Sequence, residues 1–122
     1  MTGHAARFAV GSEHLDDGTV VVNVSGEVDI GTAPDFEDAL SRAVEDRLRS
    51  ALVVDLTGVG FIDSTGLNAL VRALERQRLA GSSLVLVSND SRVAMMLEVT
   101  RLDRVLRRYK TRDEALAAAR DE

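Results

Sequence analysis

The chain has 122 residues, a formal net charge of −5 and no cysteine, and these values restrict its class. A chain of this length can fold as one domain that buries about two-thirds of its unfolded surface. The absence of cysteine excludes disulfides, thiolate metal sites and thiol catalysis, and it favours a cytoplasmic setting. The acidic charge argues against nucleic-acid binding, and no apolar run approaches the roughly 20 residues of a membrane span. We therefore expect neither nucleic acid nor a membrane as a partner.

The N-terminal third predicts a hairpin followed by a helix. Arg7–Val10 and Val20–Val24 are expected strands, and Asp17-Gly18 between them is typical of a tight antiparallel turn. Residues 1–6 are expected to form a flexible tail. Thr32-Ala33-Pro34 predicts the start of a helix, because threonine is a common cap and proline in the first turn costs no backbone hydrogen bond. The apolar face of this helix should contain Phe36, Leu40, Ala43, Val44 and Leu48.

The rest of the chain alternates strands and helices. Leu52–Leu56 is apolar and rich in β-branched residues, which indicates a central strand covered on both faces. Apolar residues at helical spacing follow from Leu67 to Leu74, and Gly81 is an expected C-terminal cap. Four further elements are predicted: a strand at Leu84–Val87, a helix at Ser91–Val99, an edge strand at Val105–Tyr109 and a helix at Ala115–Ala119, with Thr111 and Glu114 at capping-box spacing. The order ββαβαβαβα predicts an α/β fold with a mixed, mostly parallel sheet, an N-terminal hairpin and about four helices.

A short polar turn joins the central strand to the next helix and is the predicted functional site. It contains Asp63, Ser64, Thr65 and Gly66, and partners of open α/β sheets bind at such turns. Asp29 ends an earlier strand, so it should lie on the same edge of the sheet. These residues also have a structural interpretation. Serine or aspartate at a helix start is usually a cap, and Asp29 could simply end its strand before a capped helix.

Sequence patterns of enzymes are missing. His4 and His14 are ten residues apart and have no carboxylate at ligand spacing, so no metal site is expected. Neither histidine has sequence support as a general base for Ser64, and the glycines near this turn do not match a phosphate-binding loop. We therefore expect no enzymatic activity and no cofactor.

A basic cluster lies near the C-terminus, where the predicted edge strand and its turns are found. Its simplest interpretation is a solvated face of that strand. The cluster consists of Arg101, Arg104, Arg107, Arg108, Lys110 and Arg112.

Two segments resemble the bacterial anti-sigma factor antagonists, the small single-domain members of the STAS family. They are GEVDIGTAPDFEDAL, residues 26–40, and VVDLTGVGFIDSTGLNALVRAL, residues 53–74. A weaker third segment, TRLDRVLRRYKTRDEAL at residues 100–116, resembles the closing helix-strand-helix stretch of the family. Because these segments span nearly the whole chain in order, the resemblance implies a single STAS domain over residues 1–122.

The resemblance implies a phosphorylation switch at Ser64. In this family the serine is phosphorylated by an anti-sigma factor that is also a serine kinase. The unmodified protein binds that factor and releases a sigma factor for transcription, whereas the phosphorylated form must first be restored by a metal-dependent Ser/Thr phosphatase. The resemblance also implies a partner-binding surface around Ser64. It would contain Asp29, Asp63, Thr65, which is also a minor candidate acceptor, Gly66 and Asn68.

Two residues depart from the family pattern. Asn68 stands where glycine commonly follows Asp-Ser-Thr-Gly-Leu, at the border of the implied partner surface, where it would affect which kinase is recognised. Arg101 replaces a common glycine, which indicates a local backbone variation. Two other functions remain open for a STAS domain: a scaffold subunit of a stress-signalling assembly, or a regulatory module of a transporter. The presence of Ser64 favours the switch.

Overall fold

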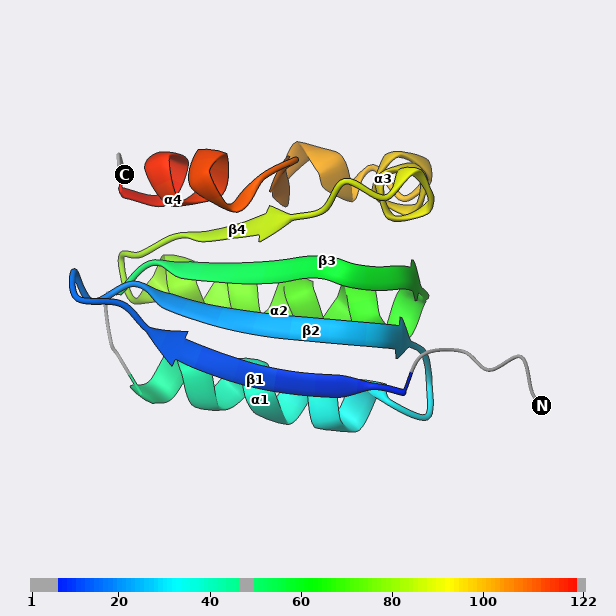
Figure 1. Cartoon of the computed structure of the whole chain (residues 1–122), viewed down its shortest axis with the longest axis horizontal. Helices are drawn as coiled ribbons and strands as arrows, with labels where there is room; N and C mark the ends of the chain where they lie inside the picture. Colours follow the sequence, from blue (N-terminus) through cyan, green and yellow to red (C-terminus); the bar gives the residue numbers. More distant parts are fainter. Residues whose placement is uncertain (1–6, 47–49, 121–122) are drawn as a thin grey trace.

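The structure is a computed structural model that describes residues 7–46 and 50–120. The predicted tail at residues 1–6 and the predicted core residue Leu48 lie outside the described residues. The α/β fold and its element order are confirmed (Figure 1). The elements are β1 (Ala9–His14), β2 (Val20–Val28), α1 (Ala33–Asp46), β3 (Leu52–Ile62), α2 (Ser64–Leu79), β4 (Leu84–Val87), α3 (Ser91–Val99), the 3₁₀ helix η1 (Leu102–Arg104), β5 (Arg107–Tyr109) and α4 (Arg112–Arg120).

The five strands form one sheet in the order β1-β2-β3-β4-β5. Strand β1 runs antiparallel to β2, as the hairpin prediction requires, and all other neighbouring pairs are parallel. Strands β1 and β5 are therefore the two edges of the sheet. The carboxyl ends of β2 and β3 lie side by side near its middle.

Several strands have different bounds from those predicted. Strand β1 begins at Ala9 and continues to His14, because His14 pairs with Val20 across the hairpin. Strands β2 and β3 extend well beyond the predicted apolar runs, to the paired residues Val28 and Ile62. Backbone pairing with a neighbouring strand holds polar residues and glycines that strand propensity disfavours. Strand β5 is shorter than predicted, because the preceding residues belong to the turn after η1.

Helices cover both faces of the sheet, as expected for the central strands. Apolar residues of α1, α2 and α3 share one buried cluster with one face of the sheet, and α4 packs on the other face. The neighbours Val53 and Val54 point to opposite faces, and both are fully buried. Burying one such side chain stabilises the fold by about 1.5–3 kcal/mol. Within residues 7–46 and 50–120, no helix is both long enough and apolar enough to cross a membrane.

Candidate functional site

The candidate site forms where β2 and β3 end side by side. Val28 and Ile62 are the last paired residues of the two strands. The N–H of Asp63 donates to the carbonyl oxygen of Val28 at 3.0 Å, which ties the start of α2 to the end of β2. Asp29 and Asp63 thus directly follow Val28 and Ile62, which pair with each other across the two strands. The structure brings these two predicted site residues to the same edge of the sheet.

Asp63 is the N-cap of α2. Its Oδ1 accepts hydrogen bonds from the backbone N–H of Thr65 at 2.9 Å and of Gly66 at 3.3 Å, and from the Thr65 hydroxyl. Burial raises the pKa of the Asp63 carboxyl, but these hydrogen bonds and one from the Ile30 N–H outweigh burial, so the pKa lies below its ordinary value. Asp63 therefore carries its negative charge at neutral pH.

Ser64 is the first residue of α2, and its side chain is exposed. The sequence left open whether the serine or the aspartate caps this helix. The structure shows that the cap is Asp63 and not Ser64. No hydrogen bond in the described part of the chain involves the Ser64 hydroxyl. The Thr65 hydroxyl, by contrast, donates to Asp63 and is half-buried. Of the two neighbouring hydroxyls, only that of Ser64 is both exposed and uncommitted.

Gly66 allows the first turn of α2 to lie directly on the strand ends. A methyl group at Gly66 would lie 2.6 Å from Cγ1 of Val28 and 2.8 Å from Cγ1 of Ile62, closer than carbon atoms can approach. Gly66 is buried, so it positions Ser64 instead of contributing a side chain to the surface. Asn68 is exposed one turn after Ser64, on the same face of α2.

Asp29 orders the loop between β2 and α1. Its Oδ1 accepts hydrogen bonds from the N–H groups of Gly31 at 2.9 Å and Thr32 at 3.1 Å. The Thr32 hydroxyl donates to the carbonyl oxygen of Glu27 at 2.8 Å, so it stabilises the loop instead of capping α1. Oδ1 of Asp29 therefore has a structural role, since it orders the loop that leads from the strand to the helix. Its Oδ2 has no hydrogen-bond partner among the described residues and remains available to a ligand or partner.

Two exposed apolar side chains next to the site were missed in the sequence. Ile30 is 78% exposed and Phe61 is 45% exposed. Ile30 belongs to the loop whose backbone contacts Asp63, and Phe61 lies three residues before Ser64. Apolar side chains held in water beside polar groups are typical of protein interfaces. Their positions in the sequence could have revealed them. Ile30 follows the end of a strand, and Phe61 precedes the buried Ile62, so its side chain points to the other side of the strand.

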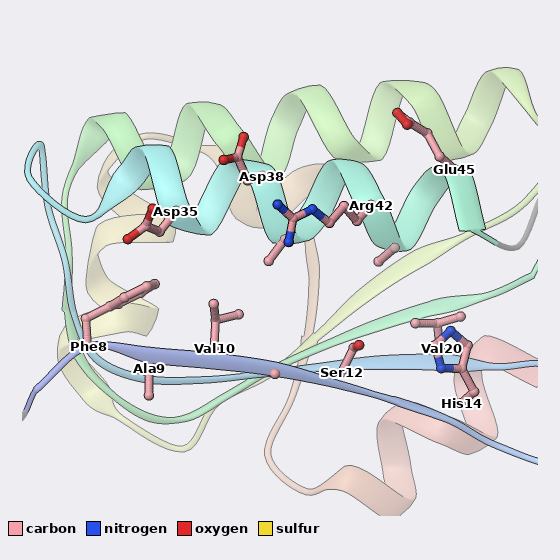
Figure 2. A pocket seen from close by; sticks show the side chains of 13 residues that line it. Phe8, Ala9, Val10, Ser12, His14, Val20, Asp35, Asp38, Arg42 and Glu45 are labelled. Atoms are coloured by element: carbon pink, nitrogen blue, oxygen red, sulfur yellow. The ribbon is translucent and has the colours of Figure 1, made fainter.

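The candidate site lies apart from the main groove of the described structure. This groove of about 880 Å³ lies between β1 and α1 (Figure 2). It is lined by Phe8, which precedes β1, by Val10 from β1 and by Asp35, Asp38 and Arg42 from α1, among others. None of the predicted site residues lines this groove. An exposed hydroxyl outside this groove suits a protein partner better than a small ligand.

Comparison with known proteins identifies the family. The model of the STAS domain matches residues 14–115, so the chain belongs to the STAS family, and the resemblance seen in the sequence is confirmed. The anti-sigma-B factor antagonist of Listeria monocytogenes is 34% identical over 95 residues, which is 78% of each chain. The anti-sigma-F factor antagonist RsfB of Mycobacterium tuberculosis is 32% identical over 106 residues, 85% of this chain and 84% of the relative.

A solved structure extends this similarity to the fold. The crystal structure of an anti-sigma factor antagonist from Mycobacterium paratuberculosis superimposes with a TM-score of 0.84 at 35% identity. The match covers 93% of this chain and 95% of that one. The present chain is therefore similar to these antagonists over 78% to 93% of its length.

Proposed function

We propose that this protein is an anti-sigma factor antagonist, switched off when Ser64 is phosphorylated. In its unmodified form it binds an anti-sigma factor with serine kinase activity and thereby releases a sigma factor in the cytoplasm. The names of its relatives support the antagonist function. The observation that carries the switch is local: Ser64 presents an exposed, uncommitted hydroxyl at the start of α2, between Asp63 and Thr65, which bond to each other.

The phosphoryl transfer requires no catalytic group from this chain. The Ser64 Oγ attacks the γ-phosphorus of ATP, a new O–P bond forms, and the P–O bond to ADP breaks. The hydroxyl proton passes to a base of the kinase. A Ser/Thr phosphatase reverses the modification by hydrolysing the O–P bond, which returns the hydroxyl and releases inorganic phosphate. This chain contributes the geometry that presents Ser64.

The physical effect of phosphorylation falls on the partner. A phosphoserine adds about −1.5 to −2 charges, which the positive end of the α2 dipole favours. The N–H groups of Thr65 and Gly66 already bond to Asp63, so the phosphate would stay at the surface beside an ionised carboxylate. A hundredfold loss of affinity requires only about 2.7 kcal/mol, which one repelled or desolvated charge at an interface supplies. The fold itself should remain intact.

The test is incubation with the cognate kinase and ATP, followed by mass spectrometry and a binding titration. We expect one phosphate on Ser64 and loss of binding to the anti-sigma factor. Ser64→Ala should remain unmodified and bind constitutively, with a stability loss of only a few tenths of a kcal/mol because the cap is Asp63. Modification confined to another residue would contradict the assignment. A chain that binds no anti-sigma factor but copurifies with a large assembly or a transporter would favour the other STAS functions.

Asp29 provides a second test of the same surface. Asp29→Asn should weaken binding of the anti-sigma factor, because Asp29 follows the end of β2 beside Asp63 and an amide removes its charge. The amide oxygen can still accept the loop hydrogen bonds, so circular dichroism should show a native fold. An unchanged affinity in a calorimetric titration would remove Asp29 from the partner surface.

A further inference from the structure

A second exposed surface follows the candidate site along α3 and η1. We call it the α3–η1 surface and define it by the side chains Met95, Val99, Arg101, Arg104 and Val105, all of which are exposed. Met95 is 60% and Val99 72% exposed. Half of the six large apolar side chains that are exposed in residues 7–46 and 50–120 lie on this surface. Arg101 and Arg104, together with the exposed Glu98 and Asp103 of the same stretch, make the surface amphipathic, as protein interfaces are.

Arg101 and Arg104 of this surface open a positively charged segment, most of which lies beyond the surface in β5 and at the start of α4. Residues 101–112 contain six basic residues and one acidic residue, a net charge of +5, so the rest of the chain carries −10 of the total of −5. Several arginines elsewhere are paired with carboxylates, among them Arg72 with Glu37 at 2.5 Å and Arg120 with Asp17 at 2.6 Å. Arg101 and Arg104 have no carboxylate within 4.0 Å among the described residues. Their charge is therefore not used to hold the fold together.

Arg101 also adopts a strained backbone conformation. Its φ of 64° and ψ of 16° lie in the left-handed region, and it is the only residue other than glycine with a positive φ in the described part of the chain. The side chain makes no hydrogen bond or ion pair there that would offset this strain. Glycine would adopt the conformation without steric strain. Strain at a position whose side chain does nothing for the fold points to a role in function.

The α3–η1 surface and the Ser64 site are close enough for one partner. Helix α3 lies at the end of the sheet toward which the arrowheads of β2 and β3 point (Figure 1). Helix α3 contacts β3, and the end of the Arg92 side chain lies over Gly60, where an added methyl group would be 2.6 Å from Nη2. Ser64 follows Gly60 at the end of the strand by four residues, which span at most about 14 Å. Arg101 follows Arg92 by about 14 Å along the direction of the helix. A standard interface of about 800 Å² per partner is roughly 30 Å across and would span both.

We infer that the anti-sigma factor bound at Ser64 extends over the α3–η1 surface and places carboxylates against Arg101 and Arg104. This inference rests on the proposed function. Interleaved apolar side chains such as Val99 and Val105 favour a folded protein over nucleic acid or anionic lipid, and so does the charge of −10 on the rest of the chain. The partner is thus held at two points. Phosphorylation controls the Ser64 point, and pairing of Arg101 and Arg104 with carboxylates of the partner strengthens the α3–η1 point.

The experiment measures association and dissociation rates of the anti-sigma factor at two salt concentrations. The double variant Arg101→Glu/Arg104→Glu should lose at least tenfold in affinity, mostly through slower association, and should show a weaker dependence on salt. The control is Arg78→Glu, an exposed arginine of α2 that has no ion pair among the described residues. For the apolar part, Val99→Ser should weaken binding, whereas Leu79→Ser should not, although Leu79 is 90% exposed.

Arg101→Gly gives a result that a structural role would not produce. It should raise the urea midpoint, because glycine removes the strain, and at the same time weaken binding, because the charge is lost. Arg101→Lys should retain most of the affinity.

Four outcomes separate this inference from the proposed function. If Arg101→Glu/Arg104→Glu binds with unchanged affinity while Ser64→Asp abolishes binding, the inference is wrong and the proposed function stands. An equal loss in Arg78→Glu would show a general charge effect and would also overturn the inference. Unchanged binding with slower removal of phosphate from Ser64 would assign the surface to the phosphatase instead. A wild-type chain that binds no anti-sigma factor would overturn both.

Discussion

Helices α2 and α3 begin in the same way and yet only one start is a candidate site. Each follows a buried parallel strand, each has an aspartate as N-cap, and each has an exposed serine as its first residue. Asp63 accepts the N–H of Thr65 at 2.9 Å, and Asp90 accepts the N–H of Arg92 at 2.8 Å. The Asp-Ser pair and its local backbone geometry therefore do not by themselves identify a phosphorylation site.

The surroundings of the two starts differ. Asp90 pairs through Oδ2 with the guanidinium of Arg92 at 2.9 Å, so a cation lies beside Ser91. Asp63 bonds only to neutral groups, and Ile30 and Phe61 are exposed nearby. The Ser64 start thus combines an unpaired negative charge with apolar contact area. What makes a helix start a switch is the surface around it, which comes from other strands and loops.

The largest expected difference between the two starts concerns charge on the serines. Ser64→Asp should mimic the phosphorylated state and reduce affinity for the anti-sigma factor about a hundredfold, or about 2.7 kcal/mol. Ser91→Asp should reduce it much less, because Arg92 compensates the added charge. A binding titration at two salt concentrations measures both, and higher salt should restore only the screened part of the loss. Equal losses in the two variants would remove the distinction between the starts.

The next expected effect concerns how closely each first turn packs. Gly66 in α2 and Val93 in α3 occupy the same position after their caps, and both are buried. Gly66→Ala should destabilise the fold by about 1–3 kcal/mol, because the added methyl group cannot fit against Val28 and Ile62. Urea unfolding measures this, with Ser64→Ala as the neighbouring control. A fully stable Gly66→Ala variant would show that the first turn of α2 can move away from the strands.

A smaller effect is expected at the opposite ends of the helices. Gly81 follows α2 at φ 76°, and Arg101 follows α3 at φ 64°, so both are left-handed. Gly81→Ala should cost about 1 kcal/mol, purely from the backbone, because an added methyl group meets no atom within 4 Å. Arg101→Gly should stabilise by about 0.5–1 kcal/mol. Thermal and urea unfolding of both variants check these opposite signs, and a shift of the same sign would contradict the comparison.

The smallest expected effect is the acid dependence of stability. The side chain of Arg92 is the main cause that lowers the pKa of Asp90 from 3.8 to about 2. A carboxyl whose pKa is lower in the folded state stabilises the fold above its unfolded pKa, and this contribution is lost as pH falls through the folded value. The free energy of unfolding should therefore decrease between pH 3.8 and about 2. Asp90→Asn, which still caps α3, should flatten this decrease, and an identical pH profile would exclude Asp90 as its source.

Sequence patterns predicted much of the fold because they report local burial. The alternation around Val53 and Val54 and the helical spacing from Leu67 to Leu74 each required an element with a defined apolar face. The turn at Asp63-Ser64 could be predicted because the spacing of apolar residues changes there from that of a strand to that of a helix. Strand ends were predicted less well, since the pairing of Val28 with Ile62 depends on a neighbour far along the chain.

The sequence by itself determined the order of the elements and the serine that stands at the start of α2. Only the tertiary structure decided the strand order, which oxygen of Asp29 is free, and that Ile30 and Phe61 face water. It also decided that Arg101 would be left-handed. The physical reason is that periodicity records whether a side chain is buried, whereas the partners of a polar atom and the strain of a backbone depend on segments brought together by folding.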